Sequence, residues 1–199
     1  AKSHARIIVL EVMGRHAGWV ALYAGIGGGA DWILIPEAPV DMNAMCHYLK
    51  EVYHGGKRYG LVVVSEGVEL PFAGTDEPEQ TDDFGHKVLK ERAVGSRVAR
   101  FIEEMTGIET RDAVIGHIQR GGPPTVFDRV LATRLGLKAA ELVSMGQFGM
   151  LTALHGVEIV AVPLENALRE PKLVPYELYE EARQIFQRVA LQPQRSGAS

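Results

Sequence analysis

Cysteine is nearly absent from the 199-residue chain, in which Cys46 is the only thiol. A disulfide framework is therefore excluded, and such low cysteine usage is typical of a reducing compartment. No apolar run approaches the roughly 20 residues that a membrane-spanning helix needs. The first residues do not resemble a signal peptide, because their apolar stretch is short and is followed at once by Glu11. We expect a cytoplasmic protein without membrane contact.

Runs of like charge are also missing. The 21 basic and 25 acidic residues give a formal net charge of −4, and lysine and arginine form no run along the chain. No nucleic-acid footprint is visible in this pattern, so we expect no nucleic-acid partner. The hydrophobic fraction of 46% is typical of a globular protein, and 199 residues can bury a core without disulfides or metals.

Several common catalytic motifs are missing as well. The seven histidines include no pair with the HExxH spacing of a zinc site. The glycine run at 27–29 lacks the Lys-Ser/Thr pair of a Walker A loop, and Ser65 does not stand between spaced glycines as in GxSxG. We expect no metal site in this chain, and we assign Cys46 to helix packing and not to catalysis.

The chain does contain a regular alternation of strand-like and helix-like segments. Strands are expected at 6–12, 32–36, 61–65 and 113–118, and one or two short strands at 151–162. Helices are expected at 16–26, 42–54 (capped by Asp41), 84–106, 127–145 and 176–190. Segments 71–83 and 192–199 are interpreted as a surface excursion and a tail. This alternation predicts an α/β fold whose mostly parallel sheet is covered by helices on both faces.

Glycine and polar residues follow three of these strands, at the carboxyl ends where open α/β sheets bind ligands. They are Met13, Gly14 and Arg15 after the first strand, Glu66 and Gly67 after the third, and Gln119, Arg120, Gly121 and Gly122 after the fourth, with His117 just before them. Glycine lets backbone approach a ligand, and a helix that opens near Arg15 would aim free N–H groups at an anion. Arginine forks suit phosphate, and a carboxylate accepts hydrogen bonds from sugar hydroxyls.

Each of these features alone has a structural explanation. A glycine-rich turn is common between a strand and a helix, and a single histidine is more often part of a core than a ligand. An acid after a strand is often a helix cap or part of a surface ion pair. Their occurrence at three adjacent strand ends instead favours a pocket for a phosphorylated polyol.

Three longer motifs resemble those of the 6-phosphofructokinase family. They are EVMGRHAGWVAL (Glu11–Leu22), similar to the fructose 6-phosphate-binding segment, VVSEGV (Val63–Val68), similar to the strand end with the sugar-binding glutamate, and GHIQRGGPP with FDRVLATRLG (Gly116–Pro124 and Phe127–Gly136), similar to the family signature. The resemblance runs from about Arg6 to Gly146. It implies the three-layer parallel-sheet substrate domain of a phosphofructokinase fold, plus a partial segment of the nucleotide-binding domain.

The resemblance also implies a role for each matching residue. Met13, Gly14 and Glu66 match positions that hold the sugar. Arg15 matches a substrate-contacting, catalytic arginine that stabilises the transferring phosphoryl group. The motif His117, Ile118, Gln119 and Arg120 matches contacts to the sugar phosphate. Arg6 and Arg111 match arginines that reach the 6-phosphate bound by an adjacent subunit, which implies a homodimer or homotetramer.

The family's donor-binding loop and its catalytic aspartate, the general base toward the sugar hydroxyl, match nothing in this chain. Mg²⁺ would bridge the donor phosphates in the full-length enzyme, and its ligands are not expected here. The chain thus resembles a C-terminal portion cut from its donor-binding half, and we expect it to be inactive alone. Residues 1–120 would form the sugar-phosphate-binding domain, 121–170 a segment of the donor domain with exposed apolar surface, and 171–199 a C-terminal helix and tail.

Together these resemblances imply an ATP-dependent 6-phosphofructokinase of glycolysis, which converts fructose 6-phosphate into fructose 1,6-bisphosphate. Pyrophosphate is the alternative donor, because the residues that distinguish the two donors lie mainly in the part that matches nothing here. A non-catalytic sugar-phosphate-binding module with the same fold is the alternative of another class. An unrelated flavodoxin-like domain would require the two longest matches, Glu11–Leu22 and Gly116–Pro124 with Phe127–Gly136, both to be accidental.

Overall fold

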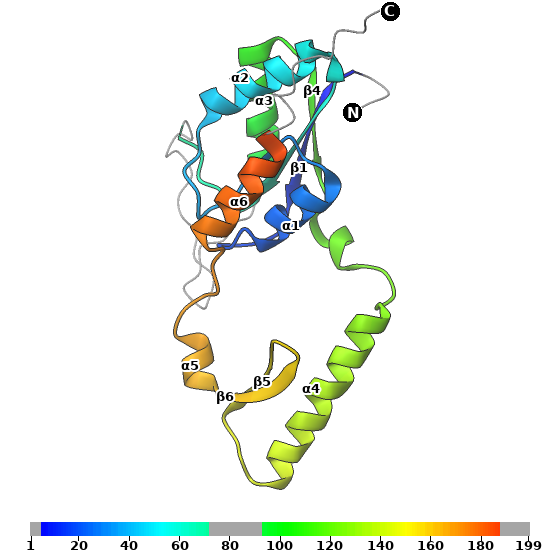
Figure 1. Ribbon diagram of the computed structural model, residues 1–199, viewed down its shortest axis with the longest axis vertical. Helices are drawn as coiled ribbons and strands as arrows, with labels where there is room; N and C mark the ends of the chain where they lie inside the picture. Colours follow the sequence, from blue (N-terminus) through cyan, green and yellow to red (C-terminus); the bar gives the residue numbers. More distant parts are fainter. Residues whose placement is uncertain (1–4, 72–92, 188–199) are drawn as a thin grey trace, which may run out of the picture. The chain divides into compact units, whose positions relative to one another are not determined.

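The computed structural model describes residues 5–71 and 93–187. Figure 1 shows its helices and strands, which are β1 (Ile7–Val12), α1 (Trp19–Gly28), β2 (Trp32–Leu34), α2 (Met42–Val52), β3 (Gly60–Ser65), α3 (Val94–Thr106), β4 (Thr110–Val114), α4 (Val126–Ser144), β5 (Met150–His155), β6 (Glu158–Pro163), α5 (Leu164–Leu168) and α6 (Tyr176–Gln187). Two short turns, η2 (Tyr53–Lys57) and η3 (Gly116–Arg120), follow α2 and β4. Most of the predicted surface excursion, the start of the predicted helix at 84–106 and the predicted tail lie outside the described residues.

Four parallel strands form the main sheet, in the order β2-β3-β1-β4. β1 is central, because Ile7 pairs with Gly60 of β3 on one side and with Thr110 of β4 on the other. Parallel strands run in one direction, so the loops that follow β3, β1 and β4 leave the same edge of the sheet. This topology confirms the predicted α/β class and its parallel sheet.

Helices cover both faces of this sheet and complete three layers. Val62 and Val64 of β3 pack with α2 and α3, whereas Val63, between them, packs with α1 and α6. This alternation follows from the two-residue period of a strand. On the second face, the buried Tyr179 hydroxyl donates a hydrogen bond to the Ile33 carbonyl (2.9 Å), which attaches α6 to β2. Both faces of β2 and β3 are therefore largely buried, as their continuous Val and Ile content predicts, whereas the edge strand β4 is exposed after Thr110.

Among the described residues, α1 and β4 differ most from their predicted bounds. α1 begins at Trp19 and not at residue 16, because the Ala17 amide closes a turn onto the Gly14 carbonyl (3.0 Å) and Gly18 caps the helix. β4 spans Thr110–Val114, whereas the prediction placed this strand at 113–118. Pairing with β1 fixes where β4 runs, and Gly116, with a φ of 49°, turns the chain away from the sheet.

The chain divides into two compact units, residues 1–119 with 173–199 and residues 120–172. The first unit holds the parallel sheet with α1, α2, α3 and α6. The second holds α4, α5 and an antiparallel hairpin of β5 and β6. The predicted division placed its boundaries at 120/121 and 170/171. That the middle segment belongs to a donor-binding domain remains a prediction.

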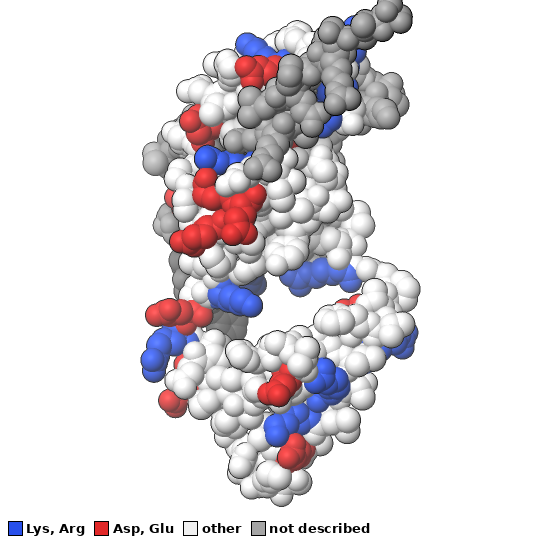
Figure 2. All heavy atoms as spheres, in the orientation of Figure 1, with Lys and Arg blue, Asp and Glu red and all other residues white. Residues whose placement is uncertain are grey.

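The second unit exposes most of its apolar side chains. Leu142 is the only buried residue in the described second unit. The exposed apolar residues include Val126, Phe127, Leu137, Phe148 and Val157. Figure 2 shows a largely uncharged surface over this unit in the view drawn. The expected exposed apolar surface is therefore confirmed. Within the described residues, no helix is both long and apolar enough to cross a bilayer.

Candidate functional site

One carboxylate holds the loop after β1 against the loop after β3. Glu66 directly follows β3, and its Oε1 accepts hydrogen bonds from the backbone N–H groups of Gly14 (3.1 Å) and Arg15 (2.9 Å). The Glu66 N–H donates to the Val12 carbonyl (3.0 Å), which continues the pairing of β1 with β3. The structure thus brings Gly14, Arg15 and Glu66 together, with Met13 between Val12 and Gly14.

Two glycines make this close approach possible. A Cβ atom on Gly14 would lie 2.4 Å from the Ala17 carbonyl oxygen and 2.8 Å from Ser65 Oγ. A Cβ atom on Gly67 would lie 1.7 Å from the Arg15 carbonyl oxygen. Arg15 itself has a φ of 49°, a left-handed conformation that residues with side chains rarely adopt. Such a loop persists only when its surroundings hold it in place.

Three amide groups at this loop are already paired with carboxylates of the protein. A helix opening near Arg15 was expected to present unpaired N–H groups to an anion. The Gly14 and Arg15 amides instead donate to Glu66, and the Gly18 amide donates to Glu37 Oε1 (2.9 Å) and Oε2 (3.1 Å). These three amides are therefore not available to a bound anion, and the expectation for the first-turn amides of α1 stays a prediction. The exposed Arg15 side chain is a further group at this loop that can contact an anion.

The loop after β4 carries the third set of predicted residues. The Ile115 amide donates to the Glu11 carbonyl (3.2 Å), after which the chain turns into η3. Within η3, His117, Ile118 and Arg120 are exposed and Gln119 is half-buried. Because β1 lies between β3 and β4, the loops with Glu66 and His117 leave the sheet on either side of the Arg15 loop, defined here as residues 13–18. Arg120 is the first residue of the second unit.

Arg6 and Arg111 lie at the opposite edge of the sheet. Arg6 precedes β1, Arg111 is the second residue of β4, and both approach the same oxygen, Glu109 Oε1, at 3.2 and 2.9 Å. The length of β1 separates this pair from Met13 by about 20 Å at the usual rise per strand residue. An arginine side chain does not span that distance. The structure therefore does not place these two arginines with the other site residues of their own chain.

A buried carboxylate lies beneath the site and was missed by the sequence analysis. Glu11 of β1 is 8% exposed, and its Oε2 accepts a hydrogen bond from the Gly95 amide (2.7 Å) at the start of α3. Burial raises the pKa of Glu11. The Gly95 hydrogen bond opposes this effect, while the carboxylates of Glu66 and Asp112 add to it. The sequence signal that could have identified Glu11 is a charged residue inside an otherwise apolar strand.

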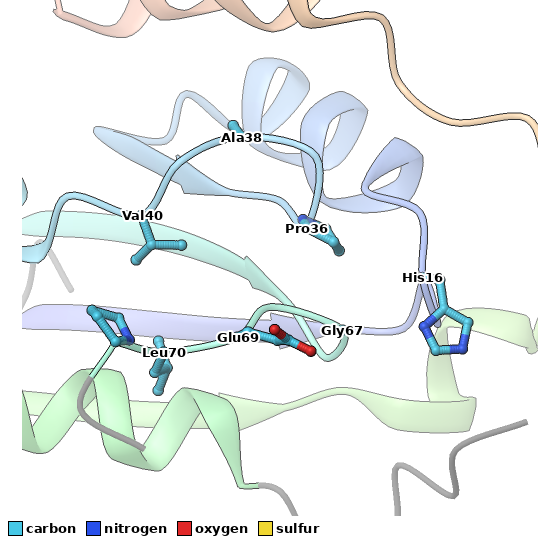
Figure 3. A pocket seen from close by; sticks show the side chains of 8 residues that line it. His16, Pro36, Ala38, Val40, Gly67, Glu69 and Leu70 are labelled. Carbon is cyan, nitrogen blue, oxygen red and sulfur yellow. The ribbon is translucent and has the colours of Figure 1, made fainter. Parts of the chain in front are cut away.

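A pocket of about 510 Å³ opens beside these loops. Figure 3 shows the loop with Pro36, Ala38 and Val40 along one wall and the loop with Gly67 and Glu69 along the other. His16, the neighbour of Arg15, lies at one end of the pocket. The pocket was also missed by the sequence analysis, since it depends on how two loops approach each other and no motif marks it.

Comparison with known proteins assigns a family to this arrangement. The family model described as phosphofructokinase matches residues 1–143. The chain belongs to the phosphofructokinase family.

Curated phosphofructokinases with different donors resemble this chain. The ATP-dependent 6-phosphofructokinase of Corynebacterium efficiens is 43% identical over 188 residues, which cover 94% of this chain and 54% of that protein. The pyrophosphate–fructose 6-phosphate 1-phosphotransferase of Amycolatopsis methanolica is 47% identical over 189 residues, again 94% of this chain and 54% of that protein. The chain thus spans about half the length of the curated relatives it matches.

Solved phosphofructokinase structures share the fold. The structure of phosphofructokinase from Saccharomyces cerevisiae matches with a TM-score of 0.63 and 31% identity over 95% of this chain and 22% of that chain. A pyrophosphate-dependent phosphofructokinase from Marinobacter aquaeolei matches with a TM-score of 0.72 over 96% of this chain and 50% of that chain. Its identity of 21% supports the fold alone. The predicted phosphofructokinase fold is confirmed.

The described part of this phosphofructokinase chain holds no cluster of metal-binding side chains. In residues 5–71 and 93–187, no three His, Cys, Asp or Glu side chains gather as a metal site requires. The buried Asp31 is already engaged by the Lys57 ammonium group and by the Leu61 amide (2.9 Å). Burial raises the pKa of Cys46 to about 11, so its thiol stays protonated near neutral pH and is a poor nucleophile.

Proposed function

We propose that this chain carries the sugar-phosphate half of a 6-phosphofructokinase, a phosphotransferase that acts on the 1-hydroxyl of fructose 6-phosphate. One observation carries the proposal. The loops after three neighbouring parallel strands bring a carboxylate, a close backbone turn, an arginine and a histidine to a single sheet edge. This is where α/β sheets bind ligands, and the groups suit a phosphorylated polyol. Curated relatives named ATP-dependent 6-phosphofructokinase support ATP as the donor.

Glu66 has two roles in this proposal, one toward the Arg15 loop and one toward the sugar. Its Oε1 is occupied by the amides of Gly14 and Arg15, whereas Oε2 makes no hydrogen bond within the described residues. The second oxygen is therefore the one that accepts from a sugar hydroxyl. Met13 and Gly14 present the backbone turn on which the sugar rests.

Arg15 and the His117–Arg120 segment meet the phosphates. Arg15 is the proposed catalytic residue, because a fixed guanidinium favours the charge that develops on a phosphoryl group in transfer. His117 and Arg120 would bind the 6-phosphate, with Ile118 and Gln119 completing the motif. Both basic side chains are exposed and available to a ligand.

Arg6 and Arg111 complete the site of a neighbouring copy in this proposal. They lie at the opposite edge from Met13, so the 6-phosphate they contact belongs to another subunit of a homodimer or homotetramer. Glu109 accepts from both guanidinium groups and keeps the two like charges together.

We assign the phosphoryl donor and its metal to none of the site residues named above. Mg²⁺ would accompany the donor and neutralise charge on its phosphates, and we assign it no ligand in this chain. Pyrophosphate is the second candidate donor, because a relative named for pyrophosphate is 47% identical. A cytoplasmic, glycolytic role belongs to the same proposal.

The proposal is tested by titrating fructose 6-phosphate into the 199-residue chain by calorimetry. We expect saturable binding, weakened by about tenfold or more in Arg120→Ala, since a bidentate phosphate contact is lost. Arg129→Ala, which removes another exposed arginine, is the matched control and should bind as the original chain does. Binding that Arg120→Ala leaves intact would contradict the site, and no binding by the original chain would contradict a sugar site carried by this half.

A further inference from the structure

Glu37 joins three segments that are far apart in the sequence. It lies in the loop after β2, and its Oε1 accepts hydrogen bonds from the amides of Gly18 (2.9 Å) and Val174 (2.9 Å). Its Oε2 also accepts from Gly18 (3.1 Å). Val174 is the second residue after the second unit, which ends at Lys172. One carboxylate thus contacts both the start of α1 and the segment by which the chain returns to the first unit.

This contact is built into the fold and is more than a local cap. A helix often satisfies the amide of its capping residue with a glutamate from its own first turn. α1 has no acidic residue in its first turn, so Glu37 supplies that acceptor from the loop after β2. Gly18 has to be glycine for this, because a Cβ atom there would lie 2.4 Å from Ile35 Cβ and 2.8 Å from Glu37 Oε2.

The two carboxylates hold the Arg15 loop at both ends. Glu66 fixes its beginning through Gly14 and Arg15, and Glu37 fixes its end through Gly18. Arg15 has an unfavourable left-handed backbone, which requires support from its surroundings. We propose that Glu37 is a positioning residue that fixes the Arg15 loop and couples it to the return segment at Val174.

The shared oxygen gives this coupling a physical basis. Gly18 and Val174 donate to the same Oε1, so a displacement of the return segment moves the acceptor on which the end of the loop depends. Removing the carboxylate leaves two partly buried amides without that acceptor, which a folded protein avoids. The functional consequence rests on the proposed function, in which this loop binds the sugar and presents Arg15.

The experiment compares Glu37→Ala with Glu37→Gln in the 199-residue chain, with Glu104→Ala as a control that removes an exposed carboxylate elsewhere. Amide hydrogen exchange is followed by NMR, and fructose 6-phosphate affinity by calorimetry. We expect Glu37→Ala to speed exchange at Gly18, at Val174 and at Arg15, and to weaken affinity about tenfold, as for loss of one hydrogen bond to a charged group. Glu37→Gln retains an oxygen acceptor and should restore both readouts, and Glu104→Ala should change neither.

Three outcomes would overturn the positioning role. The first is faster exchange at Gly18 and Val174 with Arg15 unchanged, which would make Glu37 a local cap. The second is an equal effect of Glu37→Gln and Glu37→Ala on exchange and affinity. The third is unaltered exchange at Val174 in Glu37→Ala. If the original chain does not bind fructose 6-phosphate, the proposed function fails, and exchange at Arg15 still decides the role of Glu37. Should Glu37→Ala not fold, Glu37→Asp replaces it, because its shorter side chain withdraws the acceptor from both amides.

Discussion

At the scale of single residues, the site depends on carboxylates that accept hydrogen bonds from backbone amides. Glu66 and Glu37 hold the Arg15 loop, and Glu11 meets the first turn of α3 beneath it. Carboxylates are favoured at helix N-termini by the helix dipole. The positive side chain of Arg15 therefore projects from a loop whose backbone is fixed by negative charges of the same chain.

Gly67 is predicted to be indispensable for the packing of this loop. In Gly67→Ala the new Cβ would meet the Arg15 carbonyl oxygen, and backbone cannot move away as a side chain does. We expect destabilisation of about 1–3 kcal/mol, measured by urea unfolding. Gly27→Ala in α1 is the control, because its Cβ would meet no atom within 4 Å and alanine favours a helix. A Gly67→Ala chain as stable as the original would contradict the backbone contact.

Glu11 is predicted to make stability depend on pH. Its folded-state pKa is raised above the ordinary 4.5, so the folded chain holds this proton more tightly than the unfolded chain. The associated stability is complete below that ordinary value and is lost as pH rises through the raised one. Glu11→Gln keeps an acceptor for Gly95 and does not ionise. Its stability relative to the original chain should therefore increase with pH in urea unfolding from about pH 4 to about pH 8. A difference that does not change with pH would refute this.

Single-residue chemistry was only partly readable from the sequence. The motifs marked Gly14, Arg15, Glu66 and His117, and the strands before Gly14 and Glu66 end where they were predicted to end, at Val12 and Ser65. They did not reveal that Glu66 binds loop amides, because that contact joins residues 52 positions apart. Glu37 was missed for the same reason, since its partner Val174 is 137 positions away.

At the scale of elements, local signals determined the start of α2. Asp41 was expected as its N-cap, and its Oδ1 accepts a hydrogen bond from the Ala44 amide (2.8 Å). Asp41→Ala should cost about 1 kcal/mol of unfolding free energy, which chemical denaturation measures. Asn43→Ala, an exposed change in the same turn, should have little effect. Equal stability of Asp41→Ala and the original chain would show that this cap does not stabilise the fold.

Element boundaries were predicted less well where tertiary contacts decide them. The apolar run at 113–118 resembles a strand, yet β4 ends at Val114 because its register is set by β1. The start of α1 was placed three residues early, since Glu66 and Glu37 hold residues 14–18 in a turn. Periodicity reports burial along one segment and does not report partners from other segments.

At the scale of the whole molecule, the two units differ in how much they bury. The first unit has core clusters on both faces of its sheet, whereas in the described second unit only Leu142 is buried. The sequence predicted this exposed apolar surface through the family resemblance. Local sequence signals alone did not predict the exposed surface, because they indicate only an ordinary helix. α4 has 19 residues and begins with a capping box formed by Thr125 and Asp128.

This difference predicts unequal protection from hydrogen exchange. Few buried contacts support α4, so its amides should exchange faster than those of β1 and β3, which lie between two helical layers. Peptide-level exchange measured by mass spectrometry makes the comparison. Protection of α4 equal to that of β1 would show that its apolar side chains are covered in solution, against the exposure seen in the structure.

In the proposed function, fructose 6-phosphate binds at the carboxyl edge of the parallel sheet. The measurement that tests it most directly is an NMR titration of the isotope-labelled chain with fructose 6-phosphate. We expect saturable shifts at residues 13–15, 66–67 and 117–120, with the η2 turn at Tyr53–Lys57 unchanged. Shifts confined to η2 or to residues 121–172, or no shifts at a saturating sugar concentration, would contradict it.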